Sequence, residues 1–222
     1  MRVRVVCRYD SLDSLPNVDI LTPLPTDNLW LQGLAVVLTS IQREFDIAED
    51  HIGYTTTALF VGLCIGASVW GVLSDIVGRR IAFNTTLAIA GIFGLVIGAA
   101  PNWIATASLL ACLGTGVGGN LPVDGALFLE FLPGASGGLL TLLSVWWPVG
   151  QLIASLVAWG FIPSRSCDSV VAAAGECTKE QNMGWRYTMY TLGAITFGMV
   201  STHPSSAFVV SARRRFHAET AS

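Results

Sequence analysis

Two long stretches without a charged residue constrain the fold of this chain more than any other feature. Neither Ile52 to Ser74 nor Ile81 to Val123 contains an Asp, Glu, Lys or Arg. The second stretch is long enough for two bilayer crossings, because one spanning helix needs about 20 apolar residues. Charged residues make up only 12% of the chain, against about 25% in a typical soluble domain. The sequence therefore predicts an all-α, polytopic protein whose main partner is the lipid bilayer.

Apolar segments separated by short polar or Pro-containing breaks predict six crossings in the range 25–200. Residues 1–24 and 201–222 are then expected to be a cytosolic N-terminal segment and a cytosolic tail. The first and sixth helices look incomplete for spanning helices. The six predicted helices are Pro25–Arg43, Ile52–Ser74, Ile81–Ala100, Trp103–Leu129, Leu139–Ile162 and Trp185–Val200.

Arginines set the expected orientation of these helices. They cluster in the ranges 2–8, 79–80 and 213–215, which all fall at the same side of a six-helix bundle. Short loops rich in Lys and Arg stay in the cytosol, whereas the opposite loops are rich in Asp and Glu. Trp103, Trp159 and Trp185 fall at the outer helix ends, where indole rings favour the headgroup level. The plasma membrane and the vacuolar membrane fit this pattern equally well.

Several function classes lack support in the sequence. The net charge of −3 gives no basic face for nucleic acid. Phosphate-binding glycine loops, nucleophile elbows and paired catalytic carboxylates are missing, and the Cys and His residues have no metal-ligand spacing. We therefore expect a protein that is not an enzyme and that uses neither a cofactor nor a metal.

The segment GVLSDIVGRR joins the two uncharged stretches and carries the most specific motif. Gly78 permits a chain reversal, Gly71 permits a close contact at the helix end, and Asp75 can pair with an arginine or a helix N-terminus. With Gly71, Asp75, Gly78, Arg79 and Arg80 in place, the segment resembles the signature loop between helices two and three of the major facilitator superfamily. The alternative reading is a solvated turn with positively charged anchors.

Two further segments narrow the resemblance to sugar-porter-like and synaptic-vesicle-protein-like transporters of the fungal type. The run GTGVGGNLPVDGALFLEFLP resembles their fourth helix, which ends in a Glu-x-x-Pro that Glu130 matches. In sugar porters a basic residue follows shortly afterwards, but residues 134–138 supply none. Gly184-Trp185-Arg186-Tyr187 resembles the start of their sixth helix. We expect Glu130 and Arg186 to belong with the signature loop to the conformational machinery.

The fifth predicted helix contains the candidate for substrate contact. Gly150-Gln151-Leu152 resembles the sugar-porter stretch whose glutamine contacts substrate. An amide in hydrocarbon is costly, so Gln151 is expected to face a wet cavity or to hydrogen-bond another helix. Trp146 and Trp147 are expected either to stack on a flat ligand face or to face lipid. Asn120 is a further polar candidate for the pathway, on the fourth helix.

Asp27 falls where proton-coupled sugar porters carry an aspartate in the first helix, and an ionisable group at membrane depth suggests function. In that family an arginine on the fourth helix balances the carboxylate, whereas the matching position here is Leu110 or Cys112. Pro23 and Pro25 leave open a second reading, in which Asp27 is a helix N-cap outside the membrane.

Cys167 and Cys177 lie in a predicted external loop, where the environment is oxidising. The loop therefore predicts a disulfide between them, with two free thiols as the alternative.

The family resemblance implies a transporter of a small solute, sugar-like or an organic ion, that works by alternating access. Such transporters rock two six-helix halves around a central site, and this sequence supplies the N-terminal half only. We expect that half to be inactive alone and to need a second transporter half or another copy of itself. The alternative is a non-transporting membrane interaction protein, or a truncated gene product that pairs with another half.

Overall fold

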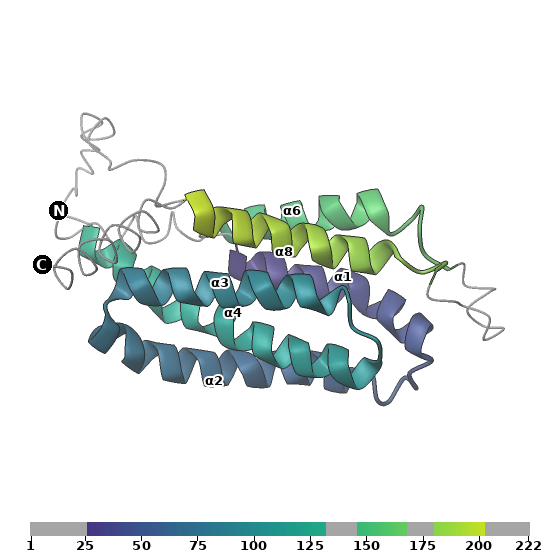
Figure 1. The fold of residues 1–222 in the computed structure, drawn as a ribbon, viewed down its shortest axis with the longest axis horizontal. Coiled ribbons are helices and arrows are strands. Elements are labelled where there is room, and N and C mark those ends of the chain that lie inside the picture. The colour runs from purple at the N-terminus through teal and green to yellow at the C-terminus, as the bar shows by residue number, and fades with distance from the viewer. Residues whose placement is uncertain (1–25, 132–145, 168–179, 203–222) are drawn as a thin grey trace, which may run out of the picture.

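Six helices make up the part of this chain that the structure describes. The computed structural model describes residues 26–131, 146–167 and 180–202, and the described part contains helices and turns but no strand. The helices lie side by side along the long axis of the molecule (Figure 1), as predicted for an all-α fold. They are α1 (Thr26–Phe45), α2 (Gly53–Val77), α3 (Arg79–Ile97), α4 (Trp103–Phe131), α6 (Trp146–Phe161) and α8 (Gly184–Thr202).

Length and composition explain which helices can cross a bilayer unaided. Gly53–Val77 and the Trp103–Pro122 part of α4 both satisfy that test, and Ile81–Ile97 and Trp147–Phe161 are shorter apolar helices. With 25 residues, α2 is about 37 Å long, which exceeds the roughly 30 Å of hydrocarbon in a bilayer. The observed helix ends lie within a few residues of the predicted ones. The predicted start of the fifth helix at Leu139 lies outside the described residues.

Two short turns connect α2 to α3 and α3 to α4, so that consecutive helices run antiparallel. Gly78 adopts φ 99° between α2 and α3, a conformation that glycine adopts without steric penalty, and its N–H donates to Ser74 O at 3.0 Å. Asn102 caps α4, because its Oδ1 accepts a hydrogen bond from Ala105 N at 2.8 Å. We call the end of the bundle near the α2–α3 turn the Gly78 end, and the opposite end, where α1 finishes, the Glu44 end.

Glycines bring α2 and α4 into backbone contact. A Cβ added at Gly62 would collide with the carbonyl of Ala111, and one added at Gly118 would collide with the carbonyl of Leu63. Small residues allow this approach where lipid gives no hydrophobic drive between helices. Gly71 behaves differently, because an added Cβ there would meet nothing within 4 Å. The close contact predicted for Gly71 is therefore wrong within this bundle.

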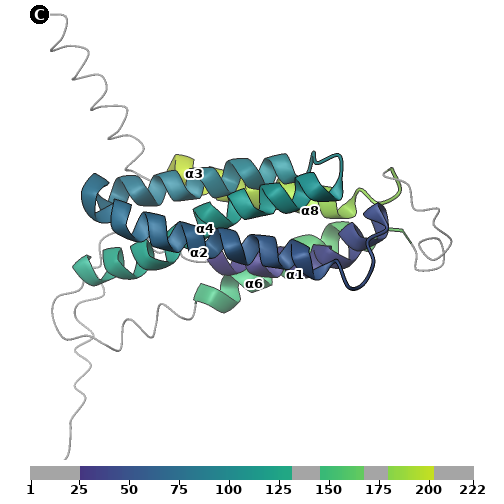
Figure 2. The same cartoon turned by 90° about the horizontal axis from the view of Figure 1, so that it is seen from below.

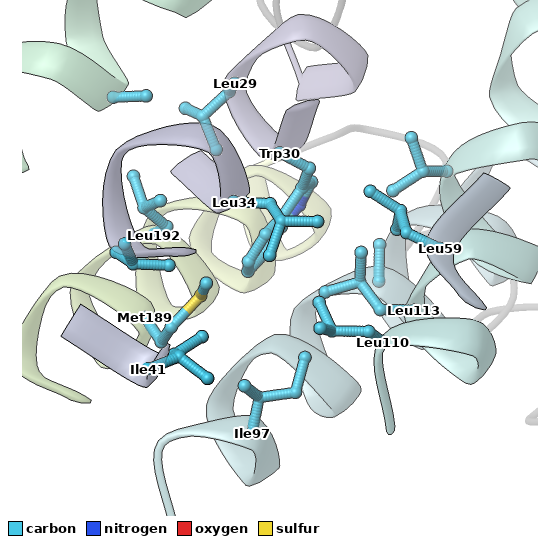
Figure 3. Packing of buried hydrophobic residues seen from close by; sticks show 14 of the residues in the cluster. Leu29, Trp30, Leu34, Ile41, Leu59, Ile97, Leu110, Leu113, Met189 and Leu192 are labelled. Carbon is cyan, nitrogen blue, oxygen red and sulfur yellow. The ribbon is translucent and has the colours of Figure 1, made fainter. Parts of the chain in front are cut away.

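The core lies where α1 crosses the other helices. The ring of Trp30 on α1 occupies the space beside Gly94 of α3, where a Cβ would collide with it. Leucine and isoleucine side chains surround this ring from α1, α2, α3, α4 and α8 (Figure 3). The labelled members are Leu29, Leu34, Ile41, Leu59, Ile97, Leu110, Leu113, Met189 and Leu192.

One face of α2 carries a continuous set of exposed apolar side chains. They are about half exposed or more, and they are Phe60, Val61, Ile65, Val69, Val72 and Ile76. A soluble protein rarely exposes so large an apolar face. In a bilayer the same face contacts lipid or another membrane helix.

Candidate functional site

A set of amide, carboxyl and hydroxyl side chains lies well inside the bundle. The described parts of α1 and α6 begin partway along the bundle, at a level where α3 and α4 continue toward the Gly78 end (Figure 1). Asn120 precedes Phe131, the last residue of α4, by about 16 Å of helix. These polar groups therefore lie at membrane depth, where each unsatisfied group is costly.

Asp27 and Asn120 meet across the α1–α4 contact. Asp27 is 4% exposed and Asn120 fully buried, and the Asn120 amide lies beside the Asp27 carboxyl. Thr86 on α3 donates a hydrogen bond to Asn120 Oδ1, which leaves the amide nitrogen on the side of Asp27. Asp27 Oδ1 and Asn120 Nδ2 have no partner that meets hydrogen-bond geometry within the described part of the chain.

The structure places Asp27 in the first turn of α1, and its role in the pathway stays a prediction. Its side chain is buried inside the first turn of α1, so it is not an exposed cap outside the membrane. Leu110, one of the two positions expected to match the arginine of proton-coupled sugar porters, is buried in the apolar core.

Gln151 makes the interhelical hydrogen bond that was one of its two predicted environments. Its Nε2 donates to Asn28 Oδ1 on α1 at 3.3 Å, and the pair is exposed. Trp147 lies one helical turn before Gln151 and is 51% exposed, whereas the side chain of Trp146 is not among those described. An exposed amide pair at membrane depth requires water rather than lipid beside it. A wet cavity beside Asn28 and Gln151 therefore stays a prediction.

A second polar contact continues the seam between α1 and α6, which lie beside each other in Figure 2. Gln32 Nε2 donates to Ser155 Oγ at 3.2 Å, and this pair is partly buried. Sequence reasoning missed Asn28, Gln32 and Ser155. The repeat of polar residues at i and i+4 on both helices is the signal that could have found them.

At the Gly78 end, Asp75 and Arg79 of the signature loop form an ion pair with each other. Arg79 Nη2 lies 3.6 Å from Asp75 Oδ1, one helical turn away. Both side chains reach solvent, with 31% and 69% exposed fractions respectively, so the pair is weak. The side chains of Arg80 and Glu130 are not among those described.

Arg186 lies at the Glu44 end rather than near the signature loop. Its Nη2 lies 2.5 Å from Glu44 Oε1, and both side chains are buried. Its Nη1 donates to Gly98 O and Ala100 O, each at 2.9 Å. Arg186 thus joins the ends of α1, α3 and α8 in one buried cluster. Sequence reasoning missed Glu44, because the predicted first helix stopped one residue before it.

Trp185 corrects one expectation about the membrane interface. It was predicted at the headgroup level, yet it is fully buried and donates from Nε1 to Glu44 Oε2 at 2.6 Å. The Arg186 guanidinium lies 4.5 Å from the centroid of its ring. Trp185 therefore completes the Arg186 cluster instead of anchoring the bundle in lipid headgroups. Trp159 is 77% exposed, as an interface anchor would be.

Cys167 is disulfide-bonded, whereas Cys64 and Cys112 are free. The partner of Cys167 lies outside the described residues, as does Cys177, so the pairing of these two cysteines stays a prediction. Arg43 Nη1 donates to Cys167 O at 3.3 Å, which ties the end of α6 to the end of α1.

Apolar spanning helices, a polar seam at membrane depth and a basic turn at one end together are typical of a polytopic membrane transport protein. The family model described as "Major Facilitator Superfamily" matches residues 28–214. The chain belongs to this superfamily of transporters and is an integral membrane protein, which confirms the family predicted from the signature loop.

Relatives in fungi and animals support the same assignment. The chain is 46% identical over 170 residues to "Major facilitator-type transporter hxnZ" of Emericella nidulans, covering 77% of this chain and 30% of the relative. It is 45% identical over 171 residues to "MFS siderochrome iron transporter 1" of Ceriporiopsis subvermispora, covering 77% and 32%. It is 26% identical over 187 residues to "Synaptic vesicle glycoprotein 2A" of Rattus norvegicus, covering 82% and 24%. The chain therefore spans about a third or less of the length of these relatives.

Proposed function

We propose that this chain forms the N-terminal half of a small-solute transporter and lines one wall of its pathway. The observation that supports this most is the exposed Gln151 amide, hydrogen-bonded to Asn28 at membrane depth. Such a group is stable beside water and not beside lipid. Asp27 and Asn120 extend the same polar region into the bundle, and Trp146 and Trp147 offer rings for a flat solute.

The solute moves by alternating access between this half and a second one. The signature-loop residues Gly71, Asp75, Gly78, Arg79 and Arg80 act at the Gly78 end together with Glu130, and Arg186 holds the Glu44 end together. One six-helix half cannot enclose a cavity, so these 222 residues do not transport alone. The exposed apolar face of α2 favours a membrane-embedded partner, either a second transporter half or another copy of the chain.

Uptake measurements test this proposal. A longer polypeptide that contains this bundle is expressed in yeast with Gln151 or with Gln151→Ala, and uptake is followed for labelled hexoses, small organic ions and a ferric siderophore. The expected result is uptake of one of these solutes that falls about tenfold or more in the variant, because a substrate hydrogen bond is lost. Ser108→Ala is the control and keeps full uptake, because the exposed Ser108 hydroxyl donates to Ile104 O within α4.

Full uptake by the Gln151→Ala protein would remove Gln151 from the pathway. Uptake by the 222-residue chain alone, equal to that of the longer polypeptide, would contradict the requirement for a second half.

A further inference from the structure

The seam between α1 and α6 contains two hydrogen bonds of similar length but different exposure. The Gln32 to Ser155 bond is partly buried, whereas the Asn28 to Gln151 bond is exposed. A buried side-chain bond between two membrane helices holds them together. An exposed bond at the same depth faces water, where a solute can reach both of its partners.

The Asn28 and Gln151 amides keep unused hydrogen-bonding capacity. Their mutual bond takes one N–H of Gln151 and one lone pair of Asn28 Oδ1. That bond does not use the amide nitrogen of Asn28 or the Oε1 of Gln151. The pair therefore presents donors and an acceptor side by side.

Charge on this wall disfavours an anionic ligand. Four described arginine side chains are engaged near helix ends: Arg43 with Cys167 O, Arg79 with Asp75, Arg165 with the Tyr187 ring, and Arg186 with Glu44. The described ranges contain no lysine. The carboxyl group nearest in sequence to the pair, Asp27, faces Asn120 on α4 and adds no positive charge that would bind an anion.

We infer that Asn28 is a substrate-contacting residue. Asn28 and Gln151 together bind a neutral group that carries a hydrogen-bond donor and an acceptor on neighbouring atoms. A carboxamide and a vicinal diol both have this chemistry. The inference rests on the proposed pathway and adds to it a second residue and a ligand class. The hydrogen bond from Gln32 to Ser155 joins α1 to α6 and does not contact the ligand.

Trp147 makes an aromatic ligand the appropriate probe. Its ring is half exposed and lies one helical turn from Gln151, within reach of a flat ring whose polar group contacts the amide pair. Benzamide and catechol supply the two neutral groups, while benzoate and benzylamine supply matched charged groups of either sign.

Saturation-transfer NMR on the 222-residue chain in lipid nanodiscs, with empty nanodiscs as background, measures the binding of these four probes. We expect benzamide or catechol to bind and benzoate and benzylamine to bind at least about tenfold more weakly. Asn28→Ala and Gln151→Ala should each lower the affinity for the neutral probe by about threefold to tenfold. The double variant should lose little more than either single variant, because both amides grip one group.

Ser155→Ala is the matched control on the same seam. It should keep probe affinity and lower only the thermal stability of the chain. Unchanged affinity in Asn28→Ala, equal loss in Ser155→Ala, equal binding of the charged probes, or no binding of either neutral probe would each overturn the inference. Comparison of benzamide with catechol identifies which neutral group is preferred.

Uptake and binding measurements together distinguish the transport proposal from the inference about the Asn28 and Gln151 amide pair. If Gln151→Ala abolishes uptake while Asn28→Ala binds benzamide and catechol normally, the transport proposal stands and the amide-pair inference fails. If both variants lose probe binding while uptake by the longer polypeptide is unaffected, the pair is a ligand site outside the transport pathway.

Discussion

At the scale of single residues, the buried ion pair between Arg186 and Glu44 makes the sharpest prediction about stability. Arg186 is 1% exposed and Glu44 is 4% exposed. Arg186→Gln leaves the Glu44 carboxylate buried without its counter-charge, so it should lower the free energy of unfolding by about 3–5 kcal/mol. Thermal unfolding of the nanodisc-embedded chain, followed by circular dichroism, measures the loss.

The exposed ion pair between Asp75 and Arg79 supplies the control for that experiment. Asp75 is 69% exposed in its contact with Arg79, so Arg79→Gln should cost less than about 1 kcal/mol. A double variant, Glu44→Gln with Arg186→Gln, should recover part of the loss because no unpaired charge remains. Equal effects of Arg186→Gln and Arg79→Gln would show that the buried pair adds nothing.

Residue identity alone could suggest the pathway residues but not their partners. The cost of an amide in hydrocarbon pointed to Gln151, and the cost of an ionisable group pointed to Asp27. Their neighbours Asn28 and Asn120 depend on how α1 rotates against α4 and α6, which side-chain packing decides. Trp185 illustrates the same limit, because the buried Glu44 carboxylate overrides the ordinary preference of an indole for the headgroup level.

At the scale of helices, the contact between α2 and α4 predicts opposite effects for two alanine substitutions in one helix. Gly62→Ala places a methyl group against the Ala111 carbonyl and should destabilise the chain by about 1–3 kcal/mol through overpacking. Gly71→Ala meets open space and should stabilise α2 by about 0.5–1 kcal/mol through lower chain entropy. Thermal unfolding of both variants beside the parent protein checks the difference. Similar behaviour at the two positions would refute the close contact.

Helix positions followed well from the sequence because the bilayer imposes a length and excludes charge. The starts of α3 and α4 were predicted within two residues, since Gly78 and the Pro101-Asn102 turn interrupt apolar runs. Which glycines pack against a helix did not follow. Gly62 and Gly71 lie in the same apolar helix, and only the position of α4 distinguishes them.

At the scale of the whole molecule, the arginine distribution predicts which end of the bundle faces the cytosol. One cysteine is added at Asp75 near the Gly78 end, or at Glu49 beyond the Glu44 end, after Cys7, Cys64 and Cys112 are replaced by serine. A membrane-impermeant maleimide added to intact cells should label Glu49→Cys above the parent background. It should label Asp75→Cys only after permeabilisation. The reverse pattern would invert the topology.

The sequence separation within the Arg186 cluster has a consequence for biogenesis. Arg186 follows Glu44 by 142 positions, so at about 5–20 residues per second a ribosome needs about 7 to 28 s to supply it. During that interval the newly made α1 carries a carboxylate whose counter-charge does not yet exist. A nascent chain stalled before Arg186 is thus expected to be retained by insertion factors or degraded, and release should follow once the sixth span emerges.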